Sequence, residues 1–341
     1  MRTGNRIAHV LVGLVLGALA ACRDDGGTST PPPPPPPADG AVGAEDGATP
    51  GDDAGEGDAG APAGDAGGAG AEPVVVAAWN LHNFSTYGTR ELRIDAIAAQ
   101  IDALDADVVG VEEIKVEDGT EGVGPQAWDA LLERLPTHDG VHNPYDTFDT
   151  AVGLIFRRAT ATIVDYQTIL TSDRDAFPRP PLDVTVRVVR GTTDITFHVV
   201  VVHLKAFGDS VERRRSACAM LRAYIESHPD RDWIVIGDFN DDPYDPPAEN
   251  SFVGTFLDAE PDFHFVTASL PPESITSLGY YHYVDGVQIR GELLDHAVVT
   301  GSLVSRFAEV VPSIVATDDL DAWEMTHSDH FPIVVTFAPL D

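Results

Sequence analysis

Cysteine is scarce in this chain of 341 residues, which contains only Cys22 and Cys218. Two cysteines can form at most one disulfide, so a framework of several bridges is excluded. Cys218 lies at helical spacing from Leu221 and Ile225, which indicates a buried residue that fills space beneath a helix. The folded part of the chain must therefore depend on its apolar core, and the chain is long enough to form a large one.

Basic residues are also scarce. The chain has 21 Lys and Arg against 55 Asp and Glu, a net charge of −34, and only two lysines, Lys115 and Lys205. Tight nucleic-acid binders are usually basic, because they neutralise phosphates, and this composition argues against that class. A phosphate substrate would need bound cations or a local basic patch. Arg179 and the run 213–215 are candidates for such a patch, although an arginine run is also typical of a solvated helix face.

The N-terminal apolar run, 7–21, is too short to span a bilayer comfortably. Arg2 and Arg6 precede it, which is typical of an export signal. Leu-Ala-Ala-Cys at 19–22 resembles a bacterial lipobox, in which the cysteine is lipidated and becomes the first residue. We therefore predict a lipoprotein signal peptide over 1–22, which leaves one thiol and no intramolecular disulfide. Cleavage near Ala21 without lipidation is the alternative.

A low-complexity segment follows the predicted signal. Residues 23–72 hold seven consecutive prolines, 31–37, and then Gly, Ala and Asp in loose repetition. Such a segment cannot bury an apolar core, so we predict a disordered tether that is stiff only across the prolines. The remaining stretch, 73–341, is about the size of one large α/β domain.

Apolar periodicity in 73–341 predicts many strands and few helices. The predicted strands are 74–79, 107–111, 151–157, 161–170, 182–190, 194–202, 233–236, 281–284, 293–300 and 331–337. The predicted helices are 90–104, after a Thr89 cap, 125–135, which starts at a proline, and 210–227. This pattern predicts an α/β fold: a four-layer α/β sandwich of two packed, mostly antiparallel mixed sheets with helices on the outer faces.

The sequence Gly-Asp-Phe-Asn at 237–240 follows an apolar strand. Asp238 and Asn240 are two residues apart, which places their side chains on one face of a strand, and glycine lets the backbone approach a ligand closely. A carboxylate beside a carboxamide can hold and deprotonate a water near a metal-bound phosphate. The alternative, a loop of turn formers, does not explain why Asp and Asn flank an aromatic residue.

Two further clusters end the first two predicted strands. Asn80 can bind a metal-bound water or a phosphate oxygen, or can simply form a turn. Glu112 and Glu113 follow the second strand, and Mg²⁺ often binds through one or two protein carboxylates. A helix cap or a solvated acid pair is the alternative for these two glutamates.

Histidines complete the set. His203 ends a strand and can donate a hydrogen bond to a phosphate, to which Lys205 adds a positive charge; a structural histidine is the alternative. Asp329 and His330 precede the final strand, and Asp295 could hold the His330 imidazole protonated and oriented. Surface polar pairs are the alternative for these last clusters.

Together and in this order, the clusters resemble the endonuclease/exonuclease/phosphatase superfamily, the fold of pancreatic deoxyribonuclease. The resemblance covers about 74–338, and Gly-Asp-Phe-Asn and Ser-Asp-His are its most specific motifs. The run Tyr-Tyr-His-Tyr at 280–283 is similar to secreted bacterial nucleases of this superfamily. Packing of an edge strand is the alternative for those tyrosines.

The resemblance implies roles for individual residues. It implies metal binding by Asn80, Glu113 and Asp329, with Mg²⁺ as the cofactor and Mn²⁺ or Ca²⁺ as alternatives. Glu112 stands where the family has glutamine, which leaves open which of the two glutamates is the ligand. The implied catalytic residues are His203, Asp238, Asn240, Asp295 and His330, and the candidate substrate-binding residues are Lys205 and Arg179.

The expected function is an exported, metal-dependent phosphodiesterase, in first place a monomeric nuclease that hydrolyses DNA or RNA through an activated water. Family members also cleave sphingomyelin and inositol phosphates, so a lipid phosphodiesterase or a phosphomonoesterase is an alternative, and a non-catalytic envelope binding module is another. We expect membrane contact only through the lipid anchor. The expected location is the bacterial cell envelope, outer membrane or periplasm, or the exterior.

Overall fold

The computed structural model describes residues 70–84, 93–115, 125–144, 150–284 and 287–340, all within the unit Asp65–Asp341. The predicted signal peptide, nearly all of the predicted tether and the predicted Thr89 cap lie outside these ranges. Within them, no helix is long and apolar enough to cross a membrane.

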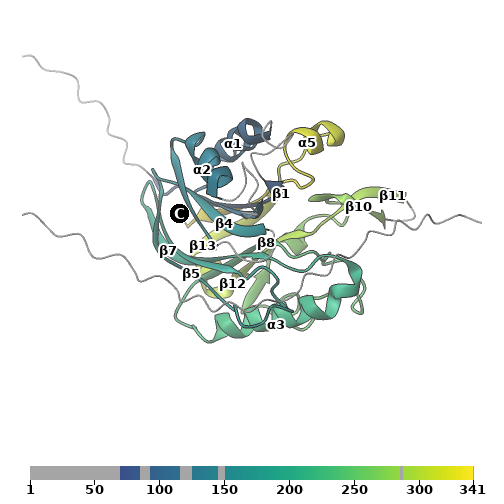
Figure 1. Cartoon of the computed structure of the whole chain (residues 1–341). Coiled ribbons are helices and arrows are strands. Elements are labelled where there is room, and N and C mark those ends of the chain that lie inside the picture. The colour runs from purple at the N-terminus through teal and green to yellow at the C-terminus, as the bar shows by residue number, and fades with distance from the viewer. Residues whose placement is uncertain (1–69, 85–92, 116–124, 145–149, 285–286, 341) are drawn as a thin grey trace, which may run out of the picture. The chain divides into compact units, whose positions relative to one another are not determined.

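Two six-stranded sheets form the centre of the described part of the chain (Figure 1). The first has the order β13 (Phe307–Ile314), β14 (Ile333–Pro339), β1 (Val74–Phe84), β2 (Val108–Lys115), β4 (Thr150–Arg157) and β3 (His138–His142). The second has the order β5 (Ala161–Thr168), β6 (Leu182–Arg190), β7 (Thr193–His203), β8 (Trp233–Asp238), β12 (Asp295–Thr300) and β9 (Phe263–Phe265). A separate hairpin pairs β10 (Ser277–Val284) with β11 (Val287–Glu292).

Both large sheets are mixed. The pairs β1–β2 and β7–β8 are parallel, and the other described pairs are antiparallel. Each parallel pair therefore brings two carboxyl ends to one edge of its sheet. This arrangement confirms the predicted mostly antiparallel mixed sheets.

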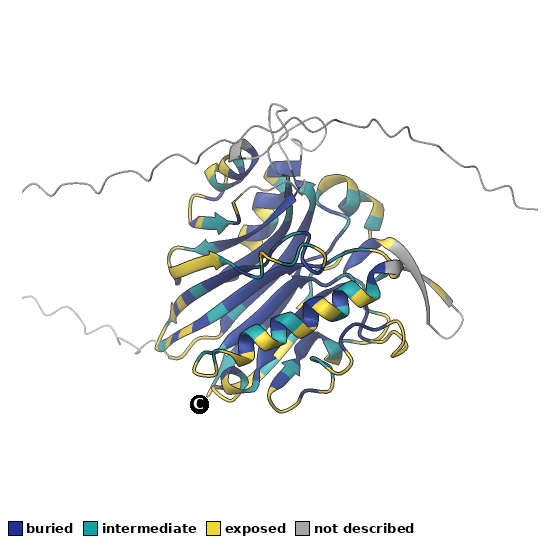
Figure 2. Ribbon diagram, turned by 60° about the horizontal axis from the view of Figure 1, so that its bottom comes forward, coloured by how far each residue is buried: buried dark blue, intermediate teal, exposed yellow. Residues whose placement is uncertain are grey.

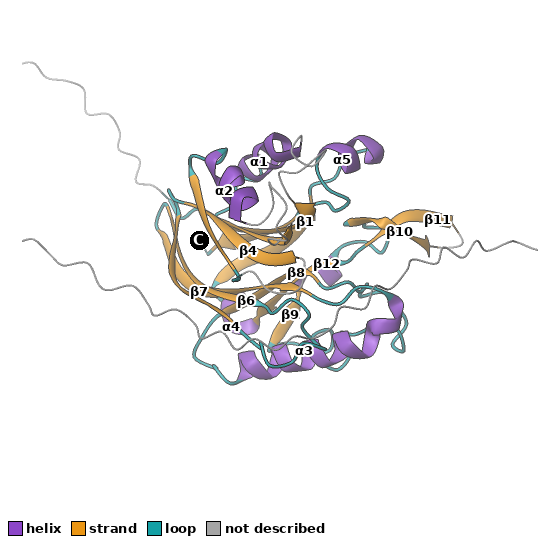
Figure 3. Ribbon diagram, in the orientation of Figure 1, coloured by secondary structure: helices purple, strands orange, loops and turns teal. Residues whose placement is uncertain are grey.

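Helices cover the outer faces of the two sheets (Figure 3). On the first sheet lie α1 (Ile94–Ala103), α2 (Pro125–Glu133) and α5 (Leu320–Thr326), whose buried residues share a core with β1 and β2. On the second sheet lies α3 (Val211–Glu226), whose buried residues share a core with β7 and β8. The short α4 (Gly301–Val304) and two 3₁₀ turns, η2 (Gly208–Ser210) and η3 (Val266–Ser269), join elements. The four predicted layers are thus confirmed.

Alternation of side chains along each strand separates the cores. On β1, Val74, Val76 and Ala78 enter the core between the sheets, while Ala77 and Trp79 enter the core beneath the helices. The other central strands alternate in the same way, so buried residues line both faces of the sheets (Figure 2). Burial on both faces explains why these strands are almost continuously apolar in sequence.

Several elements differ from the prediction. The strands β3, β9, β11 and β13 and the helices α4 and α5 were not predicted. The strand predicted over 293–300 begins only at Asp295, because the backbone N–H groups of Leu294 and Asp295 both donate to the Thr276 hydroxyl. The strand predicted over 161–170 ends at Thr168, and Leu170 has a positive φ of 54°. Of the predicted helix 90–104, residues 90–92 lie outside the described part.

Candidate active site

The candidate site lies at one end of the core between the sheets. On each central strand, the side chain two places along from the last residue that faces that core points the same way and is polar. The side chains at these positions are Asn80 on β1, Glu112 on β2, His203 on β7, Asp238 on β8 and Asp295 on β12. All five residues are at most 2% exposed. The pattern that buries valines in the core therefore brings five polar side chains to one place.

Register explains why the five meet. Asn80 is opposite Glu112 in the parallel pair β1–β2, and His203 is opposite Asp238 in the parallel pair β7–β8. Asp295 is opposite Asp238 in the antiparallel pair β8–β12. The carboxyl ends of four strands and the amino end of a fifth thus lie at one mouth of the sandwich.

Asp238 is held on both oxygens. The Asn80 amide donates to Oδ2 at 2.9 Å, and the Asn240 backbone N–H donates to Oδ1 at 2.8 Å. Burial, reinforced by the negative charge of Asp295, raises the pKa of Asp238 to about 7. A carboxylate whose pKa lies near neutrality is suited to accept a proton from water.

The backbone that presents Asp238 at the end of β8 requires glycine. Gly237 has a φ of +133°, and a Cβ there would lie 2.2 Å from the Val202 carbonyl oxygen. Beyond the strand, the Asn240 side-chain amide donates to the Leu204 carbonyl at 3.2 Å, and the Leu204 N–H donates to the Asp238 carbonyl at 2.9 Å. These contacts fix the end of β8 against the end of β7.

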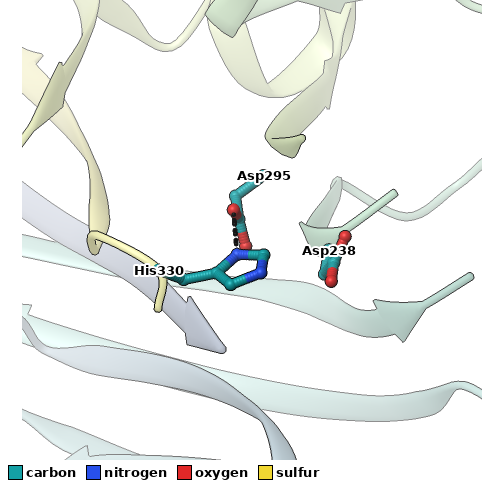
Figure 4. A group of neighbouring side chains, drawn as sticks. All are labelled: Asp238, Asp295 and His330. Atoms are coloured by element: carbon teal, nitrogen blue, oxygen red, sulfur yellow. Dashed lines mark hydrogen bonds and ion pairs between the residues drawn. The ribbon is translucent and has the colours of Figure 1, made fainter. Parts of the chain in front are cut away.

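His330 is paired with Asp295. Its Nδ1 lies 2.7 Å from Asp295 Oδ2, and both residues are buried. Burial alone would lower the pKa of His330, but the charge and hydrogen bond of Asp295 raise this pKa well above its usual range. The imidazole is therefore protonated at neutral pH. Figure 4 shows its second nitrogen directed toward Asp238, and ligand atoms of all three residues lie within 4.8 Å of one another.

The His330 backbone is held by two indoles that the sequence did not reveal as site residues. Trp79 Nε1 and Trp323 Nε1 each donate to the His330 carbonyl at 2.9 Å. The Ser328 hydroxyl donates to the Asn80 carbonyl and accepts from the His330 N–H. The loop before β14 is thereby attached to β1 and α5, and only the three-dimensional arrangement makes this visible.

The two adjacent glutamates point in different directions. Glu113 has a φ of +56°, accepts from the Asn80 amide at 3.3 Å and from the Asn83 N–H at 2.8 Å, and has a side chain 20% exposed. Glu112 is fully buried and points toward Gly237, and neither of its oxygens has a hydrogen-bond partner among the described residues. Burial, followed by the charges of Asp295 and Asp238, raises the pKa of Glu112 well above its usual range. Glu113 is the glutamate placed to bind a cation.

His203 lies close to both Asp238 and Glu113. Its Nε2 is 3.6 Å from Asp238 Oδ2 and 3.8 Å from Glu113 Oε1. Burial, and next the positive charge of Arg179, lowers the pKa of His203 well below its usual range. A neutral imidazole at this position can donate one hydrogen bond to a phosphate oxygen.

The remaining predicted residues lie around this centre. Asp329 Oδ1 is 3.3 Å from His82 Nδ1, and its side chain is 24% exposed. Arg179 is half-buried and donates to the Thr150 hydroxyl at 2.9 Å. The Lys205 ammonium lies 4.8 Å from the centre of the Phe207 ring.

The arginine run 213–215 does not form the basic patch considered above. Arg214 is 3% exposed and donates to the Lys205 and Phe207 carbonyls. Arg213 donates to the Asp175 carbonyl, and Arg215 donates to the carbonyls of 247, 248 and 250. These guanidinium groups tie loops to α3, so the run is neither a phosphate patch nor a freely solvated face.

The oxygen atoms of the site fit a hard divalent cation. Glu113 offers a partly exposed carboxylate beside the Asn80 amide, and Asp329 adds a second carboxylate on the adjoining loop. Buried Asp295 Oδ1 has no hydrogen-bond partner among the described residues, which adds an uncompensated oxygen to the site. Asp238, Asp295 and His330 form a second possible ligand group, but His330 Nδ1 is already paired with Asp295.

Comparisons with known proteins show the family and the fold of this chain. The profile of the Endonuclease/Exonuclease/phosphatase family matches residues 77–330, and the chain belongs to that family. Members of this family hydrolyse phosphoester bonds and generally use divalent metal ions. The comparison with curated proteins found no significant match.

Solved structures show the same fold at low sequence identity. TDP2 of D. rerio, complexed with a single-strand DNA product, is 16% identical, with a TM-score of 0.56, over 78% of this chain and 99% of that chain. A family member from Bacteroides vulgatus is 18% identical, with a TM-score of 0.54, over 79% and 100%. The mannosyl-6-phosphatase of Bacteroides thetaiotaomicron is 16% identical, with a TM-score of 0.51, over 77% and 98%. The narrower likeness to secreted bacterial nucleases remains a prediction.

Proposed function

We propose that this protein is an exported, metal-dependent phosphodiesterase that hydrolyses nucleic acid. The observation that carries the proposal is the convergence of a partly exposed carboxylate, Glu113, with an aspartate whose pKa is about 7, Asp238, and a charged imidazole, His330. A phosphodiester needs a proton acceptor for the attacking water, a positive group for the developing charge and a donor for a nonbridging oxygen. The site offers all three.

The contacts support the following chemical roles. Asp238 takes a proton from a water oriented by Asn240, and that water attacks phosphorus in line. As the P–O bond to the leaving group breaks, His330 stabilises the developing negative charge or transfers a proton to the leaving oxygen. Asp295 keeps the His330 ring oriented and charged through the 2.7 Å contact. His203 donates to a nonbridging oxygen.

We assign the cation to Glu113, Asn80 and Asp329. A bound Mg²⁺, or Mn²⁺ or Ca²⁺ in its place, would polarise the phosphate and offset charge in the transition state. This assignment also explains how a chain of net charge −34 could attract a polyanion, because cations at the acidic mouth reverse the local field. Lys205 and Arg179 then contact flanking phosphates.

The choice of nucleic acid as substrate has one supporting comparison. The D. rerio TDP2 structure of the same fold contains a single-strand DNA product. A phosphomonoesterase is the second candidate, because the B. thetaiotaomicron mannosyl-6-phosphatase also shares the fold. A lipid phosphodiesterase is the third, because the predicted anchor at Cys22 would hold the domain near a membrane.

A substrate panel tests the proposed activity. The purified chain is incubated with single-stranded DNA, duplex DNA, RNA, mannose 6-phosphate and choline phospholipid vesicles, each with Mg²⁺, Mn²⁺, Ca²⁺ or EDTA. We expect metal-dependent cleavage of nucleic acid, with the Asp238→Asn variant as the inactive control. Turnover of the sugar phosphate or the vesicles alone would move the assignment to that class. No chelator-sensitive turnover at all would leave the binding-module alternative.

We further propose that Cys22 is lipidated and that the exported domain is monomeric. Fractionation of cells that express the full chain tests the anchor. The wild-type chain should follow the membrane fraction, and a Cys22→Ala variant should follow the soluble fraction. Recovery of both chains in the soluble fraction would contradict the anchor without affecting the proposed chemistry.

A further inference from the structure

Phe207 combines high exposure with an unfavourable backbone. Its side chain is on the surface, with 62% of the residue exposed, although phenylalanine is normally buried. Its φ of 78° and ψ of 146° lie in a region that glycine adopts readily and other residues rarely do. The next residue is Gly208, whose φ is not positive. The chain therefore has a bulky aromatic residue at a position where glycine would fit the backbone better.

The conformation of Phe207 is imposed by its surroundings. The guanidinium of Arg214 donates to the Phe207 carbonyl at 2.8 Å and to the Lys205 carbonyl at 3.1 Å, and the Ser210 N–H also donates to the Phe207 carbonyl. Arg214 itself is 3% exposed and lies 3.4 Å from Asp241. A buried ion pair thus holds the loop 204–207 in place. Strain maintained in this way is typical of functional sites.

The loop adjoins the candidate active site. It follows His203 directly, and its Leu204 carbonyl accepts from the Asn240 side chain at 3.2 Å. Phe207 and Asn240 line one cavity of about 190 Å³. The Lys205 ammonium lies over one face of the Phe207 ring, 4.8 Å from its centre, and places a positive charge at this exposed side chain.

Charge decides which part of a substrate this cavity could receive. Asp242, Asp245 and Glu292 also line it, so a phosphate would meet repulsion there. A neutral planar group would not. Aromatic side chains bind nucleobases by stacking, which tolerates any base sequence because every base has a flat face. An acyl chain is less suited, because a charged lysine lies over the ring and acidic residues line the same cavity.

We propose that Phe207 is a stacking platform for a nucleobase next to the scissile phosphate, with Lys205 contacting the adjoining phosphate. The substrate is then a single strand, or a strand end, whose base can leave its partner. This inference rests on the proposed nuclease function and adds the binding mode of the base.

The test uses single-stranded oligodeoxynucleotides in which one abasic residue is moved along the strand past the cleavage position. For the wild-type chain, we expect kcat/KM to fall about 5- to 150-fold when the abasic residue occupies the stacking position. Phe207→Ala should cleave the intact strand slowly and lose the distinction between intact and abasic strands. Phe207→Trp should keep the preference for the intact strand over the abasic strand. Tyr166→Ala, which removes another exposed aromatic from edge strand β5, is the matched control and should behave as wild type.

A second measurement separates binding from folding. Phe207→Gly should unfold at the same temperature as wild type or higher, because it relieves the strained backbone, while its kcat/KM on the intact strand falls as in Phe207→Ala. If Phe207→Ala retains the wild-type preference for intact strands at every position, the stacking platform is wrong. If Phe207→Ala loses only vesicle turnover, the platform is also wrong and Phe207 contacts lipid. If the wild-type chain cleaves no oligonucleotide with any cation, the proposed function itself is wrong.

Discussion

Asp238 and Asp295 lie directly opposite each other in the antiparallel pair β8–β12, and both are buried. Two carboxyl groups so placed repel when both are charged, and the cost rises with burial. His330 lies with them and pairs with Asp295 at 2.7 Å. Burial, together with the charge that this register places opposite it, raises the pKa of Asp238 to about 7, and Asp295 raises the pKa of His330 well above its usual range.

The first prediction concerns Asp238. Asp238→Asn should lower kcat on nucleic acid about 10²- to 10⁴-fold, the usual contribution of a general base, and should leave the far-UV circular dichroism spectrum unchanged. In the wild-type chain, kcat/KM should rise with pH through about 7, below the alkaline limb, because only the deprotonated Asp238 accepts a proton. A profile with no ionisation between pH 5.5 and 8.5, or a variant with near wild-type kcat, would show that another group is the base.

The second prediction separates the two possible actions of His330. If the imidazolium protonates the leaving oxygen, His330→Gln should lower kcat about 10²-fold or more with a strand whose leaving group is a sugar alkoxide. The loss of kcat should be much smaller with a p-nitrophenyl nucleotide ester, since nitrophenolate needs no proton. Equal losses on both substrates would assign His330 to charge stabilisation alone.

The pairing of His330 with Asp295 gives a third prediction, on pH. Asp295→Asn removes the negative charge that raises the pKa of His330, so this pKa falls. A reaction that needs the protonated imidazole declines as pH rises through that pKa. The alkaline limb of kcat/KM should therefore move to lower pH in Asp295→Asn. An alkaline limb at the same pH as in the wild-type chain would contradict a catalytic use of this pair.

The fourth prediction distinguishes the adjacent glutamates. Glu113→Gln should weaken Mg²⁺ binding, because a charged ligand is lost. The Mg²⁺ concentration that gives half of the maximal rate should rise about tenfold or more. Glu112→Gln should change that concentration little, because Glu112 is fully buried next to Gly237, whereas Glu113 is partly exposed. Magnesium titrations of activity, with isothermal titration calorimetry of the cation alone, measure both. The reverse result would make Glu112 the ligand.

The convergence of these strand-end side chains can be predicted from the sequence because it follows from periodicity. Side chains two places apart on a strand point to the same side. A polar residue two places after a core residue therefore lies at the end of the same core, as Asp238 does after Ile236. Parallel pairing then brings strand ends together. The strand predicted over 182–190 has the observed bounds for the same reason.

Other features depend on contacts that no local pattern contains. The orientation of Glu113 follows from its positive φ, whereas the sequence left open whether Glu112 or Glu113 is the ligand. The strand β9 has three residues and β3 has five, too few to show a period. The strand β13 contains Pro312, which is tolerated because β13 lies at the edge of its sheet. The exposed Phe207 looked like any apolar residue after a strand.

The last prediction uses Glu112, the fully buried acid next to Glu113. Its pKa is raised well above the ordinary value of 4.5 in the folded chain. Below pH 4.5 the carboxyl is protonated in both the folded and the unfolded chain, so it contributes no pH dependence. Between 4.5 and the folded pKa, only the unfolded chain releases the proton, and the free energy of unfolding falls by up to about 1.4 kcal/mol per pH unit.

Glu112→Gln has the same shape and no proton to lose, so it should be more stable than the wild-type chain at pH 8 and equal to it near pH 4. Urea unfolding in EDTA, followed from pH 4 to 9, measures the difference, which should grow steadily with pH. Glu309→Gln, on the exposed face of β13, is the control and should show no such growth. A stability difference between the two chains that stays constant from pH 4 to 9 would mean that Glu112 gains a partner when it ionises. Glu112 would then not be the acid without a hydrogen-bond partner that the described contacts indicate.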